Sequence, residues 1–335
     1  MGLSNAEYEA ILREYDAQQM EDHHEQSRRR EEVYAAIPVF AELDARIAAD
    51  SVKAATLALQ GDEEAIENNR RLIEITISQK KQLLRQAGFS EDYLDMKYRC
   101  PICRDTGYLE DGSMCRCFRQ AIIDRYYLDP GRKELLATER FTAFDPSYYS
   151  DETVDEATGD TYREIAVDAY RKAFSYAEHF ADNKRNLLLT GSTGVGKTFL
   201  SNCIAGDLMD RGYTVLYLSA FRLFEIFEHY RFGNSEENKQ AVRDFDMILD
   251  CDLLIIDDLG TEIGNSYTVS QLFICMEERQ LKGKPIIIST NLNMEQIRAR
   301  YSERIASRLF NNYQYIKLMG DDIRVRKLFL EGSPD

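Results

Sequence analysis

The amino-acid sequence predicts an α/β protein in which a parallel sheet with crossover helices follows a helical region and a small cysteine-rich segment. From Tyr162 onward, helical segments alternate with short apolar runs, the pattern of strands joined by helices. Two pairs of cysteines lie ahead of this region, after a long stretch with few turn residues. At 335 residues the chain is long enough for one large core and a smaller domain. We expect four parts: a helical region (1–97), the cysteine segment (98–118), a helical connector with an acidic linker (119–160) and the sheet domain (161–335).

The charge of the chain narrows the function classes. The formal net charge is −16, which excludes a broadly basic protein that coats nucleic acid, because phosphates are neutralised by clustered Lys and Arg. It leaves room for a small DNA contact. No stretch approaches the roughly 20 uncharged apolar residues that span a bilayer. The first residues also lack the basic and apolar regions of a signal peptide. We therefore expect a cytoplasmic protein with no membrane contact.

The amino-terminal region reads as helices, with Pro38 and Gly61 as its few turn residues. Four apolar residues recur at spacings of seven, four and seven, which predicts one helical face packed on neighbouring helices: Ile66, Ile73, Ile77 and Leu84. The basic run at residues 28–30 is followed at once by Glu31 and Glu32. This neutralisation favours a solvated helix face over a nucleic-acid patch.

Four short apolar runs predict the buried strands of the sheet. They are residues 187–189, 214–218, 253–256 and 285–288. Ahead of them, residues 119–136 read as one helical segment, and the acidic stretch 151–160 reads as a solvated loop.

A glycine-rich loop follows the first predicted strand and satisfies the P-loop pattern in full. Its glycines let backbone N–H groups face phosphates, Lys197 can reach the outer phosphates, and the Thr198 hydroxyl can ligate magnesium. A strand before the loop and a helix at 199–209 after it supply the required context, which disfavours a glycine turn without a ligand. We therefore predict that ATP with Mg²⁺ binds at Gly191, Ser192, Thr193, Gly194, Val195, Gly196, Lys197 and Thr198.

Polar residues at the ends of two later strands complete this site. Asp257 and Asp258 end the run 253–256, so Asp257 is expected to hold magnesium through water and Asp258 to orient or activate the attacking water. The alternative is a strand with an acidic exit turn. Glu262 is a further candidate for the same neighbourhood. Asn291 follows the next strand, where the carboxyl ends of parallel strands line a ligand crevice, and could bond the γ-phosphate or the water.

The cysteine-rich segment reads C-x2-C, eleven intervening residues, then C-x-C. Four thiolates brought together by two tight turns suit tetrahedral zinc. An iron–sulfur cluster uses the same ligands, but no feature of the chain supports a redox role. We predict a structural zinc site with no open position, held by Cys100, Cys103, Cys115 and Cys117.

The order of these motifs, followed by residues 302–309 and 322–324, resembles the AAA+ ATPases. It is similar in particular to bacterial helicase loaders of the DnaC/DnaI type and to the related IstB-type transposition ATPases. The resemblance runs from residue 141 to the end of the sequence. It implies a P-loop AAA+ core with a reduced lid, since few residues follow Asn291.

The resemblance also implies roles for single residues. Lys197 and Thr198 match the Walker A lysine and threonine, Asp257 the Walker B metal aspartate, and Asn291 the sensor-1 residue. Arg324 looks like the sensor-2 arginine.

One implied role requires a second subunit. Arg308 matches the arginine finger, with Arg304 as the second candidate, and such a finger acts on a neighbour's ATP, so activity implies self-association. At the Walker B end the chain departs from the family, where Asp-Glu is frequent, because its second residue is Asp258. The shorter side chain predicts slow turnover or use of ATP as a switch.

In loaders of this type a helical element near residues 220–232 contacts single-stranded DNA. Phe221, Phe224 and Phe227 recur at three-residue spacing, which favours core packing over base stacking. The better DNA candidates are Arg222, Tyr230 and Arg231.

The resemblance therefore implies an ATP-dependent loader that places the replicative DNA helicase on single-stranded DNA. A zinc segment ahead of the ATPase is similar to the DnaI-type loaders more than to IstB-type proteins. Two alternatives stay open: a transposition helper ATPase, and a nucleotide-gated protein adaptor with little hydrolysis. The helicase partner rests on the resemblance alone.

Overall fold

The computed structural model describes residues 5–60, 62–128, 130–232 and 235–326. The chain divides into two compact units. One is Glu9–Ser113, and the other comprises the described residues up to Tyr8 together with those from Met114 onward.

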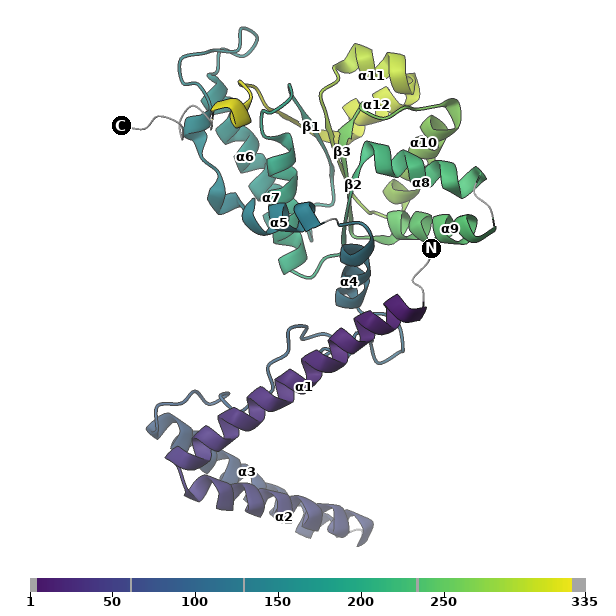
Figure 1. Cartoon of the computed structure of the whole chain (residues 1–335). Coiled ribbons are helices and arrows are strands. Elements are labelled where there is room, and N and C mark those ends of the chain that lie inside the picture. Colours follow the sequence, from purple (N-terminus) through teal and green to yellow (C-terminus); the bar gives the residue numbers. More distant parts are fainter. Residues whose placement is uncertain (1–4, 61, 129, 233–234, 327–335) are drawn as a thin grey trace. The chain divides into compact units, whose positions relative to one another are not determined.

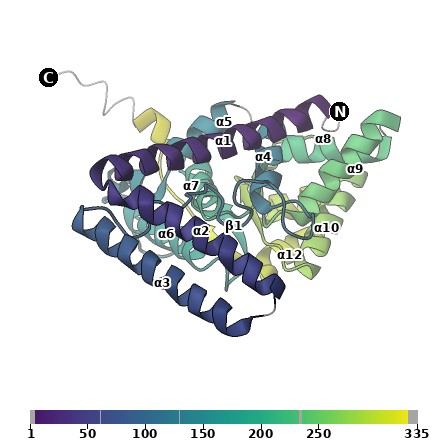
Figure 2. The same ribbon diagram turned by 90° about the horizontal axis from the view of Figure 1, so that it is seen from below.

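The unit Glu9–Ser113 is built on α1 (Asn5–Ala36), α2 (Val39–Gln60) and α3 (Glu63–Gln86). The first helix ends before Pro38, since the residue ahead of a proline is disfavoured in helical conformation. Helices α2 and α3 run side by side (Figure 2). The small core of this unit contains the buried side chains of Val33, Ile37, Phe40 and Leu84.

The expected apolar face of α3 is only partly present. Leu84 is buried, whereas Ile77 is 41% exposed, so the packing prediction is wrong for Ile77. Two polar residues of α3, Asn69 and Thr76, are buried instead. The Asn69 amide donates to the carbonyl of Asp50 at 2.6 Å, and a bond of this kind is what allows a polar group to be buried.

The three basic residues at 28–30 on α1 differ in their exposure. The side chains at 28 and 30 are exposed as expected for a solvated face, but Arg29 is buried. Its guanidinium donates to the backbone carbonyls of Tyr93 at 2.8 Å and Asp95 at 3.2 Å. The solvated-face prediction is therefore wrong for Arg29, which holds the loop after α3.

The second unit contains a five-stranded parallel sheet in the order β2-β3-β4-β1-β5. The four predicted strands are confirmed: β1 (Asn186–Thr190), β2 (Val215–Ser219), β3 (Leu253–Leu259) and β4 (Ile286–Thr290). The fifth strand, β5 (Tyr313–Lys317), was not predicted. It is an edge strand in which polar and apolar residues are mixed and only Tyr313 and Ile316 are buried, so no continuous apolar run marks it.

Helices cover both faces of the sheet (Figure 1). Alternate strand residues enter different cores because side chains alternate across a strand: Leu188 joins one cluster, and Leu187 and Leu189 join the other. One face carries α6 (Tyr162–Glu178) and α7 (Lys197–Asp210), and the other carries α8 (Ala220–Phe232), α9 (Ser235–Asp250), α10 (Ser266–Leu281), α11 (Met294–Tyr301) and α12 (Glu303–Asn312). No helix within the described ranges is long and apolar enough to cross a membrane.

The connector, predicted as one helical segment, contains two helices, α4 (Arg116–Tyr126) and α5 (Pro130–Thr138). Two short 3₁₀ turns follow, η1 (Phe141–Ala143) and η2 (Pro146–Tyr148). The Gln120 side chain of α4 lies against the edge strand β2. Its Oε1 accepts from the Val215 N–H at 2.8 Å, and its Nε2 donates to the Val215 carbonyl at 3.3 Å. A side-chain amide thus takes the place of a neighbouring strand at this position.

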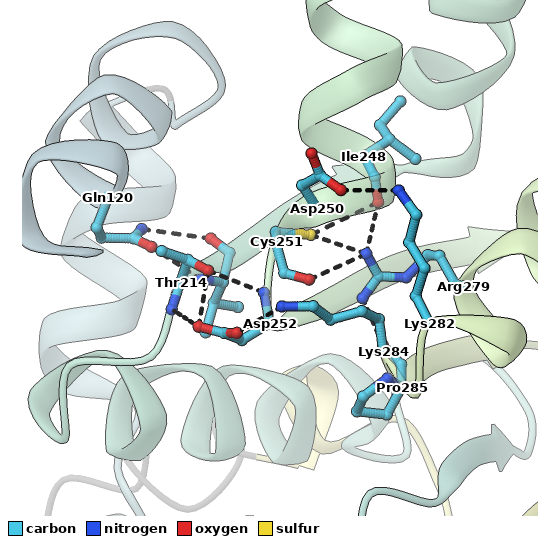
Figure 3. A network of polar contacts seen from close by, with 11 residues as sticks. Gln120, Thr214, Ile248, Asp250, Cys251, Asp252, Arg279, Lys282, Lys284 and Pro285 are labelled. Carbon is cyan, nitrogen blue, oxygen red and sulfur yellow. Dashed lines mark hydrogen bonds and ion pairs between the residues drawn. The ribbon is translucent and has the colours of Figure 1, made fainter. Parts of the chain in front are cut away.

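A buried arginine ties the amino-terminal ends of the central strands together (Figure 3). Arg279 of α10 is fully buried. Its guanidinium donates to the carbonyls of Ile248 at 2.5 Å, Cys251 at 3.1 Å and Pro285 at 2.8 Å. These carbonyls belong to the end of α9, the turn into β3 and the entrance to β4.

A second part of the same network fixes the start of β2. The Asp252 carboxylate accepts from the backbone N–H of Thr214 at 3.0 Å and from its hydroxyl at 2.9 Å, and pairs with Lys284 at 2.8 Å. These bonds lower the pKa of Asp252 against the opposing effect of burial, which is the largest influence. The strands β2, β3 and β4 are thereby held in register at the end opposite to the P-loop.

We predict that Arg279→Met lowers the free energy of unfolding by about 3 kcal/mol, because three buried carbonyls lose a charged donor. Urea unfolding followed by circular dichroism measures the change. The matched control is Lys282→Met in the same network, whose ion pair with Asp250 is exposed and should contribute less than about 1 kcal/mol. Equal losses in the two variants would contradict the structural role of Arg279.

Candidate nucleotide-binding site

The predicted P-loop joins β1 to α7 and has a backbone that glycine alone fits. Gly194 and Gly196 have φ of 79° and 98°. A Cβ at Gly194 would lie 2.1 Å from the Asp322 carboxyl carbon, and one at Gly196 would lie 2.7 Å from the Tyr149 hydroxyl. Side chains at these two positions are therefore excluded by conformation and by space.

Lys197 begins α7 and turns back over the loop. It is buried, and its Nζ donates to the carbonyls of Gly191 at 2.9 Å and Ser192 at 2.7 Å, and to the Asn291 side chain. Burial lowers the pKa of Lys197, while the nearby carboxylate of Asp258 opposes this shift. The ammonium group is thus fixed at the centre of the loop, where it can meet the phosphates of a nucleotide.

Asp257 lies at the carboxyl end of β3 and is 3% exposed. Its Oδ1 accepts from the Ser289 hydroxyl of β4 at 2.6 Å, and its Oδ2 accepts from the Tyr217 hydroxyl of β2 at 3.0 Å. The Thr198 hydroxyl lies 3.3 Å from Oδ1. A carboxylate and a hydroxyl this close present the oxygen ligands that Mg²⁺ prefers, so the predicted magnesium residues fit the ion.

Asp258 has a left-handed backbone with φ of 56°, at a register shift between β3 and β4. Its N–H donates to the Ser289 hydroxyl at 2.8 Å, and its side chain lines the cavity beside Lys197. Burial, then the Asp257 charge, raises the pKa of Asp258. Aspartate adopts the left-handed region more readily than glutamate, which gives a physical reason for Asp at this position.

The remaining predicted cavity residues come from β4 and from the end of the described chain. The Asn291 amide nitrogen lies 3.3 Å from the Thr193 hydroxyl. The Ile323 N–H donates to the Gly194 carbonyl at 3.0 Å, which places the adjacent Arg324 at the cavity wall with a largely exposed side chain. The structure thus brings the P-loop, both aspartates, Asn291 and Arg324 around one cavity of about 650 Å³.

The connector forms the other wall of the cavity, which the sequence analysis missed. Phe144 and Tyr148 of the connector line the cavity with aromatic surface, together with Phe199 of α7. The buried Tyr149 hydroxyl donates to the Val195 carbonyl at 2.9 Å, and burial raises the pKa of Tyr149 to about 12. A weak signal for this wall was the run of aromatic residues at 141–149, which no motif marks.

Arg308 and Arg304 lie on α12 and do not line the P-loop cavity. They line a separate cavity of about 600 Å³. The Arg308 guanidinium pairs with Glu277 of α10 at 2.6 Å and lies 4.7 Å from the centre of the Phe273 ring. Arg304 is exposed.

Glu262 also does not line the cavity, although we expected it in the same neighbourhood. It is buried and accepts from the Tyr301 hydroxyl, and from the N–H of Gly260 at 2.9 Å. Arg300 lies 3.5 Å from its carboxylate. The side chain therefore joins the loop after β3 to α11.

On α8 the three phenylalanines differ. Phe224 and Phe227 are buried, as core packing predicts, but Phe221 is 61% exposed, so that prediction is wrong for Phe221. Arg222 is exposed and pairs with Glu225 of the same helix. Of the other two DNA candidates, Tyr230 stacks on Phe245 with ring centres 4.8 Å apart, and the side chain at position 231 lies outside the described residues.

The predicted metal ligands come together. The sulfur atoms of Cys100, Cys103, Cys115 and Cys117 all lie within 4.8 Å of one another. Asp105 stabilises the first turn, since its carboxylate accepts from the N–H groups of Arg99 and Cys100, both at 2.8 Å. Four sulfur ligands at this spacing fit a closed tetrahedral zinc site.

Part of the second unit matches a family of known proteins. The family model described as IstB-like ATP binding protein matches residues 166–328, which include the P-loop, both aspartates and α12. This part of the chain is therefore similar to IstB-like ATP binding proteins. The predicted fold class, an α/β protein with a parallel sheet after a helical region and a cysteine cluster, is confirmed.

Two relatives to which part of the chain is similar have names that refer to chromosome replication. The chain is 26% identical over 161 residues to the replicative helicase loader DnaC of Escherichia coli K12, covering 48% of this chain and 64% of DnaC. It is 31% identical over 144 residues to the chromosomal replication initiator DnaA of Zymomonas mobilis, covering 42% of this chain and 28% of DnaA. The matches thus span less than two thirds of these relatives. A crystal structure of DnaI aligns with a TM-score of 0.43 at 22% identity, covering 55% of this chain and 93% of that chain. The predicted resemblance to DnaC/DnaI-type loaders is confirmed.

We predict that the purified protein contains about one zinc per chain and that Cys103→Ser loses it, because structural zinc requires all four thiolates. Elemental analysis by mass spectrometry measures the metal. Cys203→Ser is the control, since this buried cysteine of α7 lies outside the cluster and its loss should leave the zinc content unchanged. Iron with visible absorbance in the wild-type protein would contradict the zinc assignment.

Proposed function

We propose that this chain is an ATP-dependent loader that places a replicative DNA helicase on single-stranded DNA in the cytoplasm. The observation that carries the proposal is the convergence of Lys197, Asp257 and Asn291 on one cavity. The similarity to DnaC adds the class of partner.

ATP and Mg²⁺ supply the reactive phosphate and its counter-charge, and the residues of this chain position them. Lys197 and the P-loop N–H groups hold the phosphates, and Thr198 and Asp257 hold the metal. Asp258 orients or activates the attacking water, and its constrained backbone favours slow turnover. Asn291 and Arg324 face the same cavity from the other strand end and from the last described segment.

Arg308 acts as the arginine finger on the ATP of a neighbouring subunit. Its position on α12, away from its own P-loop cavity, supports a role in trans. Arg304, one helical turn earlier and exposed, is the second candidate. Hydrolysis then depends on self-association, because the finger and the phosphates belong to different chains.

The helical unit Glu9–Ser113 docks on the helicase. Exposed apolar side chains on α2 and α3 support a protein-binding role: Val52, Leu72, Ile75 and Ile77. Phe221 and Arg222 at the start of α8 contact single-stranded DNA. An exposed ring can stack on a base and an adjacent guanidinium can meet the phosphate backbone.

A second candidate is a transposition helper ATPase, which the IstB-like family match favours. It would use the same ATP site with a transposase as partner. A third candidate, a nucleotide-gated adaptor with little hydrolysis, is favoured by the strained Asp258 at the position of the activating acid.

We predict that Lys197→Ala abolishes ATP binding, because the loop loses the cation that meets the phosphates. Arg308→Ala should leave binding intact and lower the hydrolysis of the assembled protein by about 10³-fold, the usual contribution of an arginine finger. Calorimetry measures binding, and phosphate release with and without single-stranded DNA measures turnover. Normal hydrolysis by Arg308→Ala would exclude the finger role, and absent turnover in the wild-type protein would favour the adaptor.

The partner is tested by a pull-down of the tagged full-length chain from its native host in ATP, with mass spectrometry of the recovered proteins. We expect a replicative helicase, and we expect Leu72→Asp with Ile75→Asp to lose it, because charged groups on an apolar docking face prevent its burial. Met20→Asp, at an exposed apolar residue of α1, is the matched control. Recovery of a transposase instead would establish the second candidate.

A further inference from the structure

Arg132, the third residue of α5, reaches the magnesium side of the cavity, although no sequence motif marks it. Its Nη2 lies 3.6 Å from Oδ2 of Asp257, and its guanidinium lies 4.3 Å from the centre of the Tyr217 ring. The side chain is 22% exposed. A connector helix thus delivers a permanent positive charge to the carboxylate proposed to hold the metal.

The Arg132 guanidinium also contacts the Asn202 side chain. Its hydrogen bond to the Asn202 side chain is long, at 3.4 Å, and Asn202 has a second, shorter bond at 2.6 Å to Glu139. The Oδ2 atom of Asp257 accepts a hydrogen bond from the Tyr217 hydroxyl and also forms an ion pair with Arg132.

A cation beside Oδ2 competes with any divalent cation held by the same carboxylate. Two positive groups at one carboxylate repel each other, and the guanidinium stays charged at every working pH. The Arg132 guanidinium can therefore make room for a divalent cation only by moving away from the carboxylate. Its movement is limited by its attachment to α5, by the ring of Tyr217 and by Asn202.

We propose that Arg132 is a positioning residue that sets the affinity of the site for Mg²⁺, by sharing the Asp257 carboxylate with the ion. The inference rests on the proposed ATP-binding function and extends it to the affinity of the site for the metal. Arg132 thereby influences how readily Mg²⁺ and ATP bind together.

The experiment measures binding of a fluorescent ATP analogue to the full-length chain over a series of free Mg²⁺ concentrations and in EDTA. For Arg132→Gln we expect the half-saturating Mg²⁺ concentration to fall about two- to fivefold, the effect of one partly exposed ion pair. Affinity in EDTA should be unchanged. Arg132→Lys should shift in the same direction by less. Lys133→Gln is the matched control, because it removes one positive charge from an exposed neighbouring position on α5, and it should match the wild type.

Two results would overturn the proposal. One is an unchanged Mg²⁺ dependence in Arg132→Gln. The other is weaker analogue binding in both Mg²⁺ and EDTA, which would mean that Arg132 contacts a phosphate directly. If thermal melting shows that Arg132→Gln does not fold, Arg132→Lys decides by the same criteria. Failure of the wild type to bind the analogue at any Mg²⁺ concentration would instead refute the proposed ATP-binding function.

Discussion

The candidate nucleotide-binding site depends on one buried carboxylate, Asp257, held by hydroxyl groups from three elements. A buried charge is tolerated only where hydrogen bonds or opposite charges replace water. Ser289, Tyr217 and Thr198 supply those bonds from β4, β2 and α7. They meet because β3 lies between β2 and β4 in a parallel sheet, so the three strands end at one edge. The sheet order is thus a requirement of the site.

The same constraint explains the polar network at the opposite edge. A shift of β2 or β4 by one residue against β3 would move Tyr217 or Ser289 to the other face, since side chains alternate along a strand. Arg279 and Asp252 bind the starts of these strands through backbone groups and fix their register. The register of β2, β3 and β4 therefore links the polar network at the start of these strands to the positions of the side chains around Asp257 at their ends.

Sequence reasoning found the parts of the site that short-range patterns determine. The P-loop, the acidic end of β3, the four central strands and the cysteine cluster each depend on a few neighbouring residues. It missed Arg132 and Tyr149, because only the folded connector brings them to the cavity. It wrongly predicted that Phe221 and Ile77 are buried. A helical repeat shows which residues share a face of a helix, but it does not show whether another element packs on that face. The role of Arg308 and the four-part division of the chain stay predictions, since they depend on partners or on arrangements beyond a single unit.

The contact between the Gln120 side chain of α4 and the strand β2 has a practical consequence. β2 is an edge strand, and its unpaired N–H and C=O groups could template pairing with another chain. Gln120 blocks one such pair of groups from outside the sheet. An ATPase fragment that began after α4 would uncover this edge and be prone to aggregate through it. The tendency of the sheet unit to aggregate is therefore linked to α4, a helix whose described residues do not line the candidate nucleotide cavity.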